Sequence, residues 1–169
     1  MDSFAPFTTS HEFDAPRDLV WAVNTQPEHL LKWMGPDGFD GIHTAMDFRP
    51  GGSHHYGLRG PGGNEMWGKQ VFREIEPGRK MVYLQAFSDK DGNITAHPMA
   101  PTWPRQMLAT ATFEDAGPGR TRMTISWLPY EADDAGRVTF DAARAGMGQG
   151  FAGMWAKLEA YLKSYSSAQ

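Results

Sequence analysis

The chain has 169 residues, of which 40% are hydrophobic and 21% are charged, with a formal net charge of −4 and no cysteine. This composition is that of one ordinary globular domain, large enough to bury a core without a disulfide or a metal. The lack of cysteine excludes disulfides, thiol catalysis and thiolate metal sites. The scattered, mildly acidic charge argues against binding to nucleic acid or to an anionic membrane.

Neither the N-terminus nor any apolar run predicts a targeting or membrane segment. The first residues carry neither a basic nor an apolar segment, so no signal peptide is expected, and no apolar run approaches the roughly 20 residues that span a bilayer. Together with the missing cysteines, this predicts a protein of the reducing cytoplasm. We expect a single domain over residues 1–169, with an ordered core at about 7–164.

The N-terminal part predicts one strand followed by two short helices. Thr8 to Phe13 is a strand-like stretch. Asp14 is suited to open a helix, because its side chain can accept hydrogen bonds from the first free amides and Pro16 follows where its missing N–H costs nothing. Pro27 begins a second short helix, which ends at Gly35-Pro36.

The middle of the chain predicts six strands separated by turns rich in proline and glycine. The last of them alternates Met123, Ile125 and Trp127 with Thr124 and Ser126. Such alternation indicates an antiparallel sheet with one covered face. The six stretches are 39–48, 53–59, 65–75, 80–87, 105–114 and 121–128.

The segment from Asp133 to about Ser164 predicts one long helix. Its apolar residues recur at spacings of three, four or seven, so they share a face, and a helix of roughly 35 Å or more can cross a whole sheet. Four glycines between Gly146 and Gly153 interrupt it, at about 1 kcal/mol each. We expect closely approaching strands, an open void or a break near Gly146–Gly150 in compensation. The apolar residues are Phe140, Met147, Phe151, Met154, Leu158 and Leu162.

This order of elements predicts an α+β fold, in which a curved antiparallel sheet wraps around the long C-terminal helix and leaves an apolar cavity between them. The ten methionines and six tryptophans fit core filling, and they also fit a cavity wall that adapts to a guest, because methionine is flexible and tryptophan brings a large apolar surface.

Six segments carry the most characteristic sequence patterns: Ala15–Trp21, Pro27–Trp33, Asp47–Gly52, Phe72–Arg79, His97–Pro104 and Gly150–Leu158. Together they resemble the START-like (SRPBCC) superfamily, and within it a bacterial subgroup of the domain known as activator of heat-shock protein 90 ATPase homologue. The resemblance covers nearly the whole chain and implies the helix-grip fold. It defines no activity, because folds of this kind host lipid carriers, cyclases, aromatic-ring oxygenase domains and co-chaperone domains.

The candidate ligand-binding residues are aromatic, sulfur-containing or polar side chains on the predicted sheet, helices and loop. His54 and His55 are neighbours in a strand, so at most one of them faces the cavity. The segment 88–104 is either an ordered surface loop or a gate over the cavity mouth, and Glu65 and Arg105 are either solvated charges or groups that orient a polar head group. The candidates are Trp33, His55, Glu65, Trp67, Tyr83, His97, Trp103, Arg105, Trp127, Met147, Phe151, Met154 and Trp155.

Three functions stay open from the sequence. The leading one is binding of a small hydrophobic or aromatic molecule in the cavity, where apolar burial supplies roughly 25 cal/mol per Å². The family resemblance implies the second, a co-chaperone-type interaction with a heat-shock protein 90 ATPase. The third is an acid–base pocket enzyme, such as a cyclase, dehydratase or hydrolase. The sequence holds no nucleophile elbow, phosphate loop or paired-histidine zinc motif. We expect no cofactor and no metal, and a homodimer stays open.

Overall fold

The structure is a computed structural model that describes residues 5–36 and 38–167. Its N-terminal part is one strand and two short helices, as the sequence predicts. The second helix begins at Pro27, but the first begins after Pro16 without a side-chain cap. Asp14 instead accepts a hydrogen bond from Arg120 Nη1 at 2.6 Å. These elements are β1 (Phe7–Phe13), α1 (Arg17–Thr25) and α2 (Pro27–Trp33).

Within the described ranges, eight strands form one antiparallel sheet. The spatial order is β1-β8-β7-β5-β4-β3-β2, and β6 pairs with β5. The six predicted strands are confirmed, and the two-residue β6 is an addition within the segment predicted to be a loop. The strands after α2 are β2 (Asp40–Met46), β3 (Ser53–Arg59), β4 (Glu65–Glu76), β5 (Lys80–Ser88), β6 (Ile94–Thr95), β7 (Met107–Asp115) and β8 (Thr121–Pro129), with a 3-10 turn at Pro61–Gly63.

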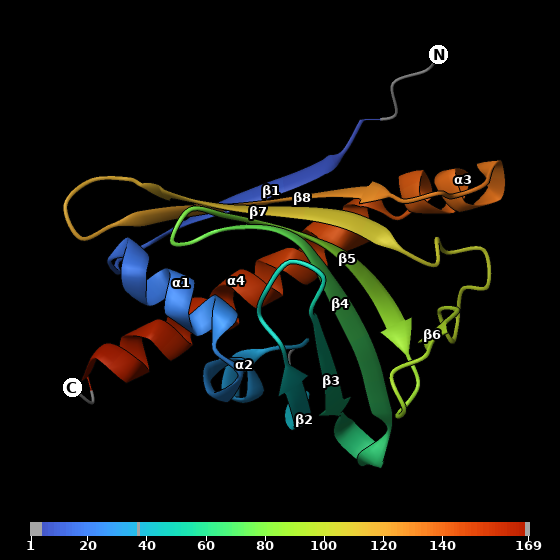
Figure 1. Cartoon of the computed structure of the whole chain (residues 1–169), viewed down its shortest axis with the longest axis horizontal. Helices are drawn as coiled ribbons and strands as arrows, with labels where there is room; N and C mark the ends of the chain where they lie inside the picture. Colours follow the sequence, from blue (N-terminus) through green and yellow to red (C-terminus); the bar gives the residue numbers. More distant parts are fainter. Residues whose placement is uncertain (1–4, 37, 168–169) are drawn as a thin grey trace.

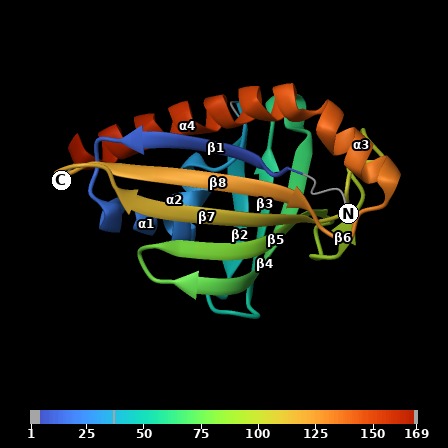
Figure 2. The ribbon, with the colours of Figure 1, turned by 90° about the horizontal axis from the view of Figure 1, so that it is seen from above.

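The sheet is strongly curved and holds the C-terminal helix on its concave side. The pairing register shifts between Gly41 and His43 in β2 and between Phe72 and Glu74 in β4, and such irregularities bend a strand. Figures 1 and 2 show the C-terminal helix, in red, crossing the sheet, with α1 and α2 at one end of the molecule. The START-like helix-grip fold expected from the sequence is confirmed.

The predicted long helix is two helices, α3 (Asp134–Ala142) and α4 (Arg144–Ser167). The break falls at Ala143, before the glycines rather than among them. Asp133 opens α3 by accepting a hydrogen bond from the Gly136 amide at 2.8 Å. The glycines are therefore compensated differently: a Cβ built at Gly146, Gly148, Gly150 or Gly153 meets no heavy atom within 4 Å outside the local helix backbone. Of the three compensations considered, open space is the one found.

The hydrophobic core fills the part of the concave face nearest α1 and α2. Phe13, Phe72 and Phe113 on the sheet are almost fully buried, as are Leu158 and Leu162 on α4. The predicted apolar face of the C-terminal segment is thus confirmed, because its second half packs into this core. No helix within residues 5–36 and 38–167 is long and apolar enough to cross a membrane.

Candidate functional site

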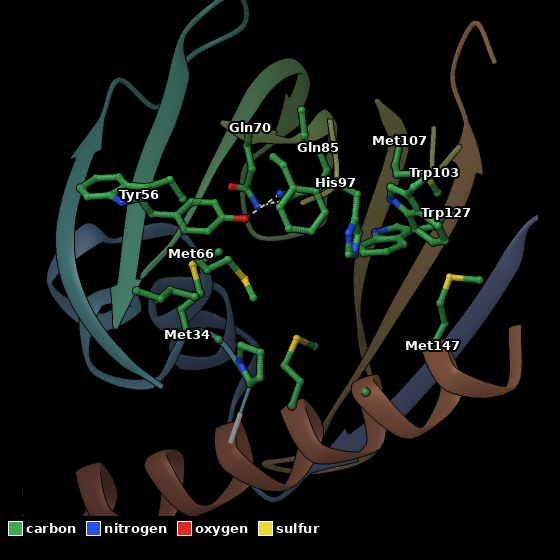
Figure 3. A pocket seen from close by; sticks show the side chains of 18 of the residues that line it. Met34, Tyr56, Met66, Gln70, Gln85, His97, Trp103, Met107, Trp127 and Met147 are labelled. Carbon is green, nitrogen blue, oxygen red and sulfur yellow. Dashed lines mark hydrogen bonds between the residues drawn. The ribbon is translucent and has the colours of Figure 1, made fainter. Parts of the chain in front are cut away.

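Beyond the solid core, the sheet and α4 separate to enclose a cavity of about 410 Å³. Its wall is mainly apolar, and half of the chain's ten methionines take part in it. Figure 3 shows labelled methionine side chains approaching the cavity from α4, from the sheet and from the loop after α2. The five are Met34, Met66, Met107, Met147 and Met154.

The helix side of the cavity is formed by the first half of α4. Met147, Phe151 and Met154 lie three, four or seven residues apart, so they point the same way. Gly150 between them also lines the cavity and adds no side chain. Further along, Lys157 Nζ donates hydrogen bonds to the Pro36 and Phe39 carbonyls at 3.3 and 3.0 Å. That contact ties α4 to the loop that closes one end of the cavity.

Aromatic side chains crowd the other end. The Trp127 ring meets Phe151 edge-on at 5.1 Å between centroids, and His97 meets Phe87 at 4.7 Å. Trp103 lies 6.0 Å from Phe140 of α3. The segment between β6 and β7 therefore contributes to the cavity wall and packs on α3, the position expected of the predicted loop. Whether it opens as a gate stays a prediction.

A chain of polar side chains runs along the sheet side of the cavity. Gln85 Nε2 donates to the Tyr56 hydroxyl at 2.6 Å, and Gln70 Nε2 donates to Gln85 Oε1 at 3.0 Å. His54 Nδ1 lies 3.3 Å from Gln70 Oε1, and its Nε2 lies 2.9 Å from Thr44 Oγ1. Figure 3 shows the Tyr56 hydroxyl pointing to Gln85 and Gln70. The chain links the cavity to a histidine that is 0% exposed.

Burial keeps these polar groups uncharged. It lowers the pKa of His54 to about 4, despite the opposing effect of the hydrogen bond that His54 donates to Gln70. It raises the pKa of Tyr56 to about 12 and also raises the pKa of Tyr83, which the nearby Tyr56 raises further. Among the described residues, no aspartate, glutamate or lysine lines the cavity. Its arginine, Arg105, is exposed and donates a hydrogen bond to the Ile94 carbonyl at 3.0 Å.

Most of the candidate residues from the sequence come together around this cavity. The nine that line it are Trp67, Tyr83, His97, Trp103, Arg105, Trp127, Met147, Phe151 and Met154. Trp67 is at its border, because the ring of Trp67 lies over Gly57 and stacks on His55 at 5.3 Å between centroids. That ring is on the opposite face of the strand from Met66 and Gln70.

Two of the four other candidates lie on the outer face of the sheet. The His55 side chain points away from the cavity, and its Nε2 forms a hydrogen bond with the Asp89 carbonyl at 3.1 Å. The exposed Glu65 accepts a hydrogen bond from Trp67 Nε1 at 3.0 Å. Alternation along β3 places His54, and with it Tyr56, on the inner face, so the histidine that faces inward is the neighbour of the one selected from the sequence.

The remaining two candidates, Trp33 and Trp155, are core residues. The indole N–H of Trp33 donates to the Val23 carbonyl at 2.8 Å, which holds α2 against α1. Trp155 packs against Phe13, and its N–H donates to Thr9 Oγ1 at 3.1 Å. Both rings belong to the buried core and neither lines the cavity.

Sequence reasoning missed the polar side of the cavity. Tyr56, Gln70 and Gln85 were not among the candidates, although they form the hydrogen-bonded chain. The strand pattern carried a usable signal: once Met66 faces inward, Gly68 and Gln70 follow on the same face. Two glutamines on neighbouring strands then identify a polar strip. Among the described residues, no group of three or more histidines and carboxylates could hold a metal ion.

Residues 14–163 match the family model described as Activator of Hsp90 ATPase homolog 1-like protein. The chain belongs to this family. Solved structures with the same fold include a Nitrosomonas europaea protein, which is 24% identical over 99% of both chains with a TM-score of 0.75. An Arthrobacter aurescens protein is 27% identical, with 95% of this chain and 87% of that chain covered and a TM-score of 0.77.

A third structure, from Mycobacterium smegmatis, is 25% identical, with 94% of this chain and 91% of that chain covered and a TM-score of 0.74. None of the curated proteins matches the chain. The family and its neighbours therefore show the START-like fold, which commonly holds hydrophobic ligands.

Proposed function

We propose that this protein binds a small, largely apolar or aromatic molecule in the cavity between the sheet and α4. The observation that carries the proposal is the volume of about 410 Å³ within a mainly apolar wall. Voids left by ordinary packing are far smaller, whereas ligand sites occupy about 300–1,000 Å³. A cavity of this size accommodates a molecule with two or three aromatic rings.

The composition of the wall supports the same proposal. Five methionines and the rings of Trp103, Trp127 and Phe151 offer polarizable, adaptable contacts to a guest. The polar groups at the sheet side are uncharged phenols and amides, which favours binding over acid–base chemistry. The alternative of a chaperone partner is suggested by the family name alone, and no surface feature of the described residues favours it over a small ligand.

Methionine methyl groups allow a direct test. The protein is labelled with 13C at the methionine methyl groups and titrated with naphthalene, a neutral two-ring probe. We expect the methyl resonances of the five cavity methionines to shift, with saturation. Met81 and Met123, which are buried in the core outside the cavity, serve as internal controls. No shift, or equal shifts at cavity and control methyl groups, would contradict the proposal.

A further inference from the structure

We propose that the Tyr56 hydroxyl donates a hydrogen bond to the bound molecule, so that the site selects a neutral aromatic ligand carrying an acceptor oxygen, such as a ketone. This inference rests on the proposed function and adds the chemical class and the orientation of the ligand. It follows from the direction in which the hydrogen-bonded chain along the sheet must run.

The direction is fixed by the two glutamines. Each amide has a carbonyl that only accepts and an NH2 group that only donates. Gln70 uses its NH2 group towards Gln85, and Gln85 uses its NH2 group towards Tyr56. Gln70 Oε1 therefore has to accept from His54, which places the imidazole proton on Nδ1. The bare Nε2 of His54 then accepts from the Thr44 hydroxyl.

At the cavity end of this chain, the hydroxyl proton of Tyr56 has no acceptor. The Tyr56 oxygen accepts from Gln85, so its own O–H is free to donate, and no hydrogen bond among the described residues takes up that proton. The raised pKa keeps the phenol protonated at neutral pH. Tyr56 lines the cavity and the chain holds its oxygen in place, so an acceptor on a guest is the group that completes the chain.

The rest of the cavity wall also favours a neutral ligand. Among the described residues, no aspartate, glutamate or lysine lines the cavity, so it offers no carboxylate to pair with an amine. Together with the free proton of Tyr56, this matches a neutral ligand that accepts a hydrogen bond, rather than an amine or a polyol.

A pair of isosteric probes tests the inference. 2-Acetylnaphthalene carries a carbonyl where 2-isopropenylnaphthalene carries a CH2 group, so the two differ mainly in the acceptor. Their dissociation constants are measured on the wild type, on Tyr56→Phe and on Tyr161→Phe. Tyr161 is a matched control, because its hydroxyl bonds His29 at 2.7 Å, away from the cavity. We expect the ketone-to-alkene affinity ratio to fall roughly 2- to 10-fold in Tyr56→Phe only.

The outcomes separate the two proposals. If both probes bind and the ratio is the same in the wild type and in Tyr56→Phe, the inference is wrong and the proposed function stands. If neither probe binds and naphthalene also fails to bind, the proposed function is wrong and the inference falls with it. A preference for indole over indene that disappears in Tyr56→Phe would show a chain of reversed direction, which also overturns the inference.

A measurement on the unmodified protein provides an independent readout. The 15N shifts of the His54 ring distinguish which nitrogen carries the proton, and His54→Gln assigns the signals. We expect the Nδ1-protonated neutral form at pH 7. The Nε2-protonated form would require both glutamine amides to be turned around, so that Tyr56 donates to Gln85 and no proton faces the cavity. That result would overturn the inference even if Tyr56→Phe failed to fold.

Discussion

The hydroxyl of Tyr56 occupies the space that a Cβ atom of Gly68, its partner in the β3–β4 register, would take. A Cβ at position 68 would overlap both the hydroxyl oxygen and the ring of Tyr56. The tyrosine can therefore lie across β4 and reach Gln85 on β5 only because residue 68 has no side chain. A glycine inside a strand often marks such a close approach.

Replacing Gly68 by alanine is expected to destabilise the fold by about 1–3 kcal/mol, because the added methyl group forces the buried Tyr56 ring out of its position. The loss is measured by urea unfolding at pH 7. The same variant should weaken the binding of 2-acetylnaphthalene, since the donor is displaced. An unchanged free energy of unfolding would mean that the Tyr56 ring can move without loss of stability, and that the chain of hydrogen bonds does not hold it.

Replacing a glycine of α4 by alanine should instead stabilise the fold. A Cβ at Gly148 meets nothing within 4 Å outside the local helix backbone, and alanine is favoured over glycine inside a helix by about 1 kcal/mol. We expect Gly148→Ala to raise the free energy of unfolding by about 0.5–1 kcal/mol in the same urea experiment. A loss of stability would show that the residue needs a conformation or a contact that only glycine permits.

Helices and strands that repeat a simple residue pattern could be predicted from the sequence. Features that depend on single side chains, such as the helix break and the polar side of the cavity, could not. The order of elements, with the alternation in β8 and the apolar spacing of the C-terminal segment, predicted an α+β fold with a curved sheet around the helix. The family resemblance implied the helix-grip fold. The break at Ala143 was not predicted, because the glycines, which the structure keeps inside α4, gave the stronger local signal of a break. At the site, residues with a large apolar surface were found readily. The polar strip was missed, since the sequence did not fix which faces of the middle strands line the cavity, and His55 rather than His54 was selected.

Filling the cavity should abolish binding while leaving the fold intact. Met147 lines the cavity from α4, and Met147→Trp adds a large ring that takes up part of the about 410 Å³. Gln149→Trp makes a similar addition two residues away, at an exposed position outside the cavity wall. We expect naphthalene affinity to fall at least about tenfold in Met147→Trp, a change of about 1.4 kcal/mol, and to stay at the wild-type value in Gln149→Trp.

Calorimetric titration measures both affinities, and thermal unfolding shows whether each variant is folded. Equal affinity in the two tryptophan variants, with both folded, would place the bound probe outside the cavity.

The buried His54 predicts a specific dependence of stability on pH. Its pKa in the folded protein is about 4, below the ordinary value of 6.5, because burial disfavours the imidazolium form. Between these values the unfolded chain binds a proton that the folded protein does not, so stability is fully present above about pH 6.5 and falls as the pH is lowered towards 4. A shift of this size corresponds to about 3 kcal/mol.

His54→Gln keeps hydrogen-bonding groups at this position and removes the titration. We therefore expect the wild type to lose about 3 kcal/mol more than His54→Gln between pH 7 and pH 4, measured as the difference in the free energy of urea unfolding. His29→Gln, which replaces a histidine of α2 that bonds Tyr161, is measured in parallel as a control for the loss of a histidine outside the hydrogen-bonded chain. Parallel pH curves for the wild type and His54→Gln would mean that His54 takes up its proton at the same pH in the folded and unfolded protein. Burial would then not hold it in the neutral form on which the direction of the hydrogen-bonded chain depends.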